Sequence, residues 1–159
     1  MPWNVLPTFT DGVSVATAAD LNKYRENMEW LHNPPKASYV YSGSDLTTTA
    51  TTWASIGASW ELTITTAGGD VLVVFSATVT NMDFDIDFDG TKWTAGTSTA
   101  TGALEVTQTV NKVMIYLPMV RTGLSAGSHT VKAMWKVPSV GTATIYGTYA
   151  PRFYVRELK

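Results

Sequence analysis

The chain has 159 residues, of which 45% are hydrophobic and 15% charged, a balance typical of one folded domain rather than of a disordered chain. Its formal net charge of −2 excludes a general attraction to nucleic acid or anionic membranes, and its longest apolar run, 71–75, is too short to insert into a membrane. The absence of cysteine excludes disulfides and thiolate metal sites, and it fits assembly in a reducing cytoplasm.

The first segment, residues 1–12, contains two prolines and one glycine, which indicates an extended arm rather than a helix. Its side chains at Trp3, Leu6 and Phe9 are large and apolar. Because such a segment would be costly to leave in water, we expect it to lie against a surface, either of this chain or of a partner.

A short helix is predicted after the arm. Thr17 and Asp20 have the spacing of a capping box, with aspartate in place of the usual glutamate, and the early negative charge suits the helix dipole. Asn33-Pro34-Pro35 predicts the end of the helix, because proline disfavours helical geometry in the residue before it and has no N–H to donate.

One face of this helix carries an apolar stripe. Its residues recur at spacings of three, four and three: Leu21, Tyr24, Met28 and Leu31. The stripe could dock on the chain's own β domain, or it could pack on symmetry-related copies or a larger assembly. About two heptads are too few to hold a free coiled coil together, so either reading requires a large partner surface. We expect the stripe, together with the apolar arm residues, to form an assembly interface.

The remainder of the chain is predicted to be mainly β. We expect an extended arm and a helix in residues 1–35, followed by an antiparallel, jelly-roll-like β-sandwich of eight or nine strands in 36–159. The run 71–75 is continuously apolar, which predicts a strand buried on both faces. The predicted strands lie at 37–42, 59–66, 71–80, 82–90, 103–110, 112–121, 129–137, 143–150 and 152–158.

The acidic segment 82–90 has two readings. Asp85, Asp87 and Asp89 match the opening of an EF-hand calcium loop, but the twelfth position, which should supply a bidentate glutamate, is a glycine. The favoured reading is a strand with alternating phenylalanine and isoleucine on one face and aspartates on the other, ending in an Asp89-Gly90 hairpin turn. Lys132 and Lys136 could then neutralise these aspartates across the sheet. We therefore expect no metal and no other cofactor.

Catalytic patterns are weak in this sequence. Residues 123–127 fit the G-x-S-x-G pattern around Ser125, but that motif needs a strand-to-helix turn, whereas the next segment alternates as a strand. A hydrolase using paired carboxylates within 83–89 is a further alternative. We expect a loop between strands at Ser125 and no enzymatic activity.

Trp93 is the aromatic residue best placed to contact a ligand. Trp60 and Trp135 lie on apolar strand faces and are expected in the core, whereas Trp93 follows the predicted hairpin in a loop. It could stack on a sugar ring, or it could simply pack within its loop.

The N-terminal pattern resembles that of many tailed-phage virion proteins, in which a W/P/T/G-rich arm leads into a T-A-x-x-L-N helix with a later R-x-N-x-x-x-L. The C-terminal half is similar to β-sandwich domains of such proteins in the segments 88–91, 124–135 and 154–158. The matching helix residues are Thr17, Ala18, Leu21, Asn22, Arg25, Asn27 and Leu31.

This resemblance implies a non-enzymatic structural protein on the virion surface, commonly a homotrimer. Its partners would be copies of itself and capsid or tail proteins, in the role of a tail fibre, a tail-tip piece, a head fibre or a head decoration. The alternative is a lectin-like β-sandwich that recognises a glycan on the host surface, with Trp93 as the candidate contact.

Overall fold

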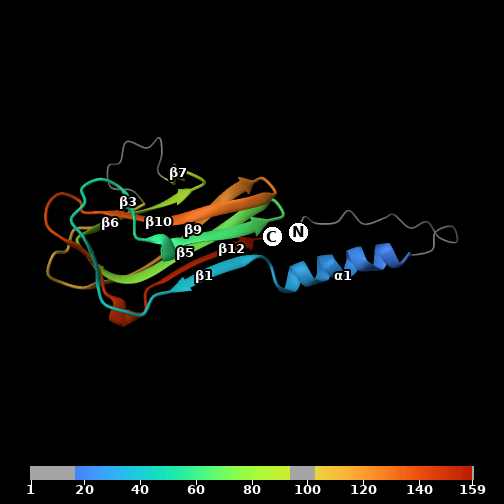
Figure 1. Cartoon of the computed structure of the whole chain (residues 1–159), viewed down its shortest axis with the longest axis horizontal. Helices are drawn as coiled ribbons and strands as arrows, with labels where there is room; N and C mark the ends of the chain where they lie inside the picture. Colours follow the sequence, from blue (N-terminus) through green and yellow to red (C-terminus); the bar gives the residue numbers. More distant parts are fainter. Residues whose placement is uncertain (1–16, 94–102, 159) are drawn as a thin grey trace.

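The computed structural model describes residues 17–93 and 103–158, which form one helix followed by an antiparallel β-sandwich (Figure 1). The mainly β fold with a preceding helix is thereby confirmed. The described residues form twelve strands rather than eight or nine, because segments of two or three residues also join the sheets. The elements are α1 (Ala18–His32), β1 (Lys36–Val40), β2 (Leu46–Thr48), β3 (Ala54–Ser55), η1 (Ala58–Trp60), β4 (Glu61–Thr66), β5 (Gly69–Thr80), β6 (Met82–Phe88), β7 (Thr91–Lys92), β8 (Leu104–Val106), β9 (Val113–Leu124), β10 (Gly127–Lys136), β11 (Ala143–Ile145), η2 (Gly147–Tyr149) and β12 (Arg152–Leu158).

The strands divide into two six-stranded sheets, here named sheet A and sheet B. Sheet A has the order β1-β12-β5-β11-β2, with β9 on the other side of β5. Sheet B has the order β3-β10-β6-β7, with β4 also paired to β10 and β8 to β6. Because the chain passes back and forth between the sheets, each sheet is built from segments far apart in the sequence.

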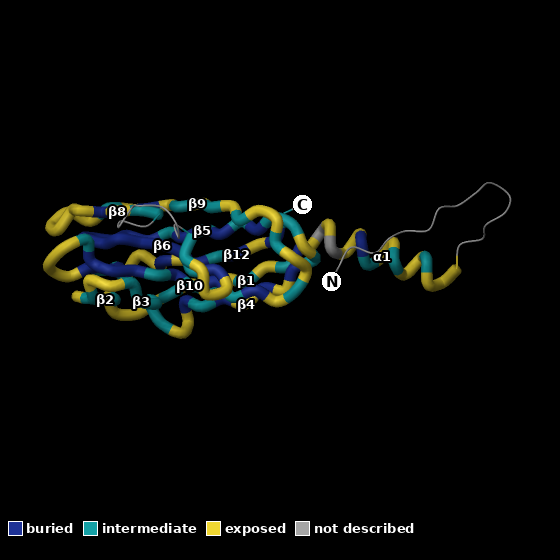
Figure 2. Tube along the Cα trace, turned by 90° about the horizontal axis from the view of Figure 1, so that it is seen from above, coloured by how far each residue is buried: buried dark blue, intermediate teal, exposed yellow. Residues whose placement is uncertain are grey.

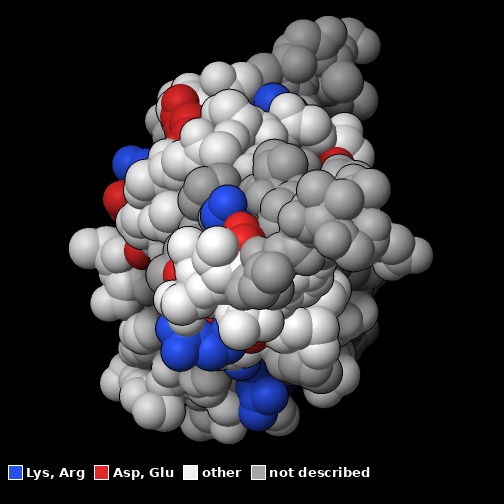
Figure 3. Space-filling view, turned by 90° about the vertical axis from the view of Figure 1, so that its right-hand side faces the viewer, with Lys and Arg blue, Asp and Glu red and all other residues white. Residues whose placement is uncertain are grey.

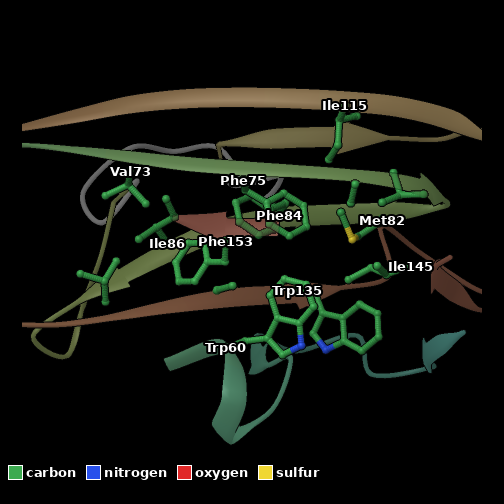
Figure 4. Close-up of a cluster of buried hydrophobic side chains, with 14 of the residues drawn as sticks. Trp60, Val73, Phe75, Met82, Phe84, Ile86, Ile115, Trp135, Ile145 and Phe153 are labelled. Carbon is green, nitrogen blue, oxygen red and sulfur yellow. The ribbon is translucent and has the colours of Figure 1, made fainter. Parts of the chain in front are cut away.

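The hydrophobic core lies between the two sheets (Figure 4). Phe75 of sheet A stacks on Phe84 of sheet B, with ring centroids 4.0 Å apart and ring planes 13° apart. Trp60 and Trp135 are almost completely buried, as expected from their places on apolar strand faces. Each large buried side chain of this kind contributes roughly 1.5–3 kcal/mol, so the sandwich has a core of its own without any contribution from α1.

Strand β5 differs from its prediction. Val71, Val73 and Phe75 point into the core and are fully buried, but Leu72 and Val74 lie on the outer face of sheet A and remain partly exposed. The expectation of burial on both faces is therefore wrong. The run is continuous because Leu72 and Val74 are apolar although they lie on the outer face of the sheet.

Strand β6 has the predicted alternation. Its four apolar side chains face the core, and Asp89 and Gly90 form the two-residue turn into β7 with φ angles of 52° and 83°. Positive φ at both positions is the requirement of a type I′ hairpin turn. The strand-and-hairpin reading of the acidic segment is confirmed.

The aspartates of β6 lie on the opposite face, but they are less exposed than an outward row would be. Asp83 and Asp85 have only 1% and 0% of their surface exposed. The Nζ of Lys136 lies 2.9 Å from Oδ2 of Asp83, which confirms the predicted cross-strand neutralisation at this position. Neither Asp83 oxygen has a well-aligned hydrogen bond, so this contact is mainly ionic. Lys132 lies opposite Asp87 in register but forms its ion pair with Glu61, at 3.2 Å.

Candidate assembly interface

Helix α1 projects from one end of the sandwich instead of packing on it (Figures 1 and 2). Its first turn is fixed locally by the predicted capping box: the backbone N–H of Asp20 donates to Oγ1 of Thr17, and the Thr17 N–H donates to Oδ2 of Asp20. Hydrogen bonds from the hydroxyl and the backbone of Thr17 lower the pKa of Asp20. The helix is therefore started by its own sequence and does not need a contact with the sandwich to begin.

The other end of α1 is tied closely to sheet A. The N–H of Asn33 caps the helix by donating to the carbonyl of Glu29, at 2.8 Å. Pro34 is buried, and the carbonyl of Pro35 accepts a hydrogen bond from the N–H of Glu157 in β12, at 3.0 Å. Since β1 starts at the next residue, the connection between helix and sheet is short and partly held by the domain.

The apolar stripe of α1 is exposed. Docking of the stripe on the chain's own domain would have buried these side chains. The exposed fractions are 60% for Leu21, 38% for Tyr24, 52% for Met28 and 46% for Leu31.

The exposed stripe represents a considerable free energy of association. Complete burial of such a side chain contributes roughly 1.5–3 kcal/mol, and about half of each side chain remains to be buried. The four residues together would therefore contribute about 3–6 kcal/mol per helix when a partner covers them. Of the other predicted interface residues, Trp3, Leu6 and Phe9 lie outside the described residues.

The charge distribution near the helix end does not oppose such a contact. In the view from that end both signs of charge appear: acidic and basic groups lie side by side near the centre, basic groups gather on the lower part, and most of the remaining described surface is uncharged (Figure 3). Within the described ranges, no helix is both long and apolar enough to cross a membrane.

The predicted metal candidates are not brought together around an ion. Oδ1 of Asp85 accepts the N–H of Ile86, and Oδ1 of Asp87 accepts the N–H of Gly90 in the hairpin turn, each at 2.8 Å. Asp89 turns away to bind β10. Residues 17–93 and 103–158 contain no group of three acidic, histidine or cysteine side chains arranged to hold a metal.

An Asp89–His129 pair was missed by the reasoning from sequence. The Nδ1 of His129 lies 2.6 Å from Oδ2 of Asp89, and the other Asp89 oxygen accepts the N–H of Thr130 at 2.7 Å. The Nε2 of His129 faces the carbonyl oxygen of Ser125, 3.0 Å away, in the loop between β9 and β10. Because Nε2 contacts a carbonyl and not a hydroxyl, His129 does not activate a nucleophile. The contacts instead link the β6–β7 turn to the loop between β9 and β10.

The same contacts shift both pKa values. Burial lowers the pKa of His129, but the hydrogen bonds to Asp89 and Ser125 outweigh it, and the net pKa is raised. Burial likewise raises the pKa of Asp89, but the hydrogen bonds from His129 and Thr130 reverse this effect, and the net pKa is lowered. No local sequence signal pairs residues forty positions apart, so only the fold could show this contact.

Trp93 is half-buried and not freely exposed. It packs against the hydrophobic core, and the guanidinium of Arg121 lies over its ring, 5.9 Å from the ring centre. One aromatic face of Trp93 therefore lies against a cation.

No protein-family profile and no curated protein matches this sequence. Among solved structures, dimeric latent PorU from Porphyromonas gingivalis is similar to 74% of this chain, at 12% identity and with a TM-score of 0.31. The matched region spans 13% of the PorU chain. At that TM-score the similarity supports no inference about fold or function.

Proposed function

We propose that this protein is a non-enzymatic structural component of a tailed-phage virion, attached to the particle as a homotrimer through its N-terminal segment. The β-sandwich is the part displayed on the virion surface, as a head decoration or head fibre, or as part of a tail fibre or tail tip. The resemblance of the arm and helix to such virion proteins gives the class of assembly.

One observation carries the proposal: a well-capped helix projects from the domain with its apolar stripe exposed. A helix whose apolar stripe is left in water is more stable when another surface covers it. Threefold symmetry would present three such stripes together, so the binding contributions of the copies would reinforce one another.

The test is a deletion of residues 1–33. The core lies between the two sheets and includes no residue of α1, so we expect the truncated protein to fold with a cooperative thermal transition. It should be absent from purified particles of the virus that encodes it, whereas the full-length protein is incorporated. Normal incorporation of the truncated protein would refute attachment through this segment.

A further inference from the structure

A hollow of about 170 Å³ lies on the outer face of sheet A, at the place where β5 changes partners. On one side β5 pairs with β12 as far as Ser76 and with β11 from Val79. Between these points the turn η2 approaches instead of a strand, and the N–H of Tyr146 donates to the carbonyl of Thr78 at 2.9 Å. The interruption in the sheet creates the hollow.

The hollow has an aromatic wall on each side and hydroxyl groups on its floor. One wall comes from β9 and the other from the end of η2, so the walls stand on opposite sides of β5, about two strand spacings or roughly 9–10 Å apart. The residues that define it are Met114 and Tyr116, Tyr149 and Ala150, and on the floor Ser76 and Thr78.

The second wall is held in place. The Nζ of Lys112 lies 4.1 Å from the ring centre of Tyr146 and 5.2 Å from that of Tyr149, and the two rings meet edge to face. Ala150 caps η2 in a left-handed conformation with φ 47°. This conformation costs free energy in any residue that has a Cβ atom. Tyr149 is thereby positioned before any ligand arrives, which lowers the entropic cost of binding.

The polar groups of the floor are uncommitted. The hydroxyls of Ser76 and Thr78 have no hydrogen-bond partner in the described part of the chain. Thr78 is nearly buried, yet its hydroxyl is not sealed from solvent, since it lies beneath the hollow. A ligand that enters would find two hydroxyl groups able to donate and accept.

These features point to one class of ligand. We propose that the hollow binds one ring of a neutral carbohydrate. No charged residue lines the hollow, and this disfavours phosphates and other ions as ligands. The volume of the hollow is below the 300–1,000 Å³ typical of sites for larger ligands. A pyranose ring has apolar C–H faces that suit Tyr116 and Tyr149 and hydroxyl groups that suit the floor. Trp93, the candidate from sequence, is not part of this site.

The experiment is saturation-transfer NMR on the full-length protein with glucose, galactose, mannose, rhamnose, N-acetylglucosamine and N-acetylgalactosamine. We expect at least one sugar to receive saturation, with a dissociation constant on the order of 1 mM. Tyr116→Ala and Tyr149→Ala should each weaken binding by about tenfold or more, and Thr78→Val by several-fold.

One matched variant, Val120→Ala, should bind as the wild type does. It removes an exposed apolar side chain from the same strand outside the hollow. Thermal melting of every variant checks that it is folded.

Two results of the sugar titration would overturn the proposal: no saturation transfer to any of the six sugars at about ten times the expected dissociation constant, or binding that survives both Tyr→Ala changes. A change in oligomeric mass on Tyr116→Ala, with no sugar bound, would also overturn it and identify a protein contact instead. A variant altered only in the helix stripe should still bind sugar, so failure of helix attachment and failure of this site are distinguishable.

Discussion

Removing two leucines from the exposed stripe should dissociate the assembly without unfolding the protein. Each Leu→Ala change deletes about three carbon groups, worth roughly 0.8 kcal/mol each on complete burial. Leu21 is 60% exposed and Leu31 46% exposed, and only this exposed part can be buried by a partner. Leu21→Ala therefore loses about 1.4 kcal/mol and Leu31→Ala about 1.1 kcal/mol. Together the double variant loses about 2.5 kcal/mol of association free energy per helix.

At 1.4 kcal/mol per factor of ten, that loss corresponds to about a 60-fold weaker contact for each helix. In a trimer all three helices are affected, so the protein should sediment as a monomer at concentrations where the wild type is associated. Sedimentation velocity over a range of concentrations measures this directly. The thermal midpoint of the sandwich should change little, because alanine favours helix and neither leucine belongs to the core.

Glu29→Ala is the matched control, because Glu29 is an exposed residue of the same helix outside the stripe. It should leave the association unchanged. Association through the stripe is refuted if wild type and double variant have the same mass at every concentration, or if the double variant unfolds at a much lower temperature than the control.

Three further predictions concern the stability of the sandwich. Lys136→Met should lower the free energy of unfolding by about 3–5 kcal/mol, because it leaves Asp83 charged and buried without a partner. Lys132→Met, at a half-exposed ion pair, should cost about 0–1 kcal/mol, and equal losses in urea denaturation would contradict this difference. The pKa of His129 is raised by folding, so the stabilisation from its contact with Asp89 is complete below the unfolded-state pKa of about 6.5 and is lost as pH rises through the higher folded value. The wild type should therefore exceed His129→Gln in thermal midpoint at pH 5–6, with the gap closing above about pH 6.5, and a gap that does not change with pH would contradict the role of the pair. The pKa of Asp89 is lowered by folding, so its own contribution should persist above about pH 3.8 and disappear as pH falls through its lower folded value.

Local patterns in the sequence determined the elements and their faces. The Thr17–Asp20 spacing defined the start of the helix, and the alternation over 82–88 defined which side of β6 enters the core. Asp89-Gly90 defined a tight turn, because these residue types tolerate positive φ. Each of these features depends on residues within about four positions of one another, where chain geometry alone decides which side chains are neighbours.

Only the tertiary structure decided what covers each face. Alternation placed Asp83 on the side away from the core, but its burial and its pairing with Lys136 depend on a strand more than forty residues later. The apolar run of β5 looked buried on both sides, yet its outer face remains partly exposed.

The same distinction applies to the two candidate sites. The sequence identified the stripe on α1 but left open whether the chain's own domain covers it, and the direction in which the helix leaves β1 decides that. The hollow between Tyr116 and Tyr149 had no signal in the sequence, because it exists only where β12 and β11 separate along β5. The hydrophobic effect is non-directional and rewards any apolar area that is removed from water. Which distant segments pair is therefore set by the packing of the whole sandwich and not by any one stretch of residues.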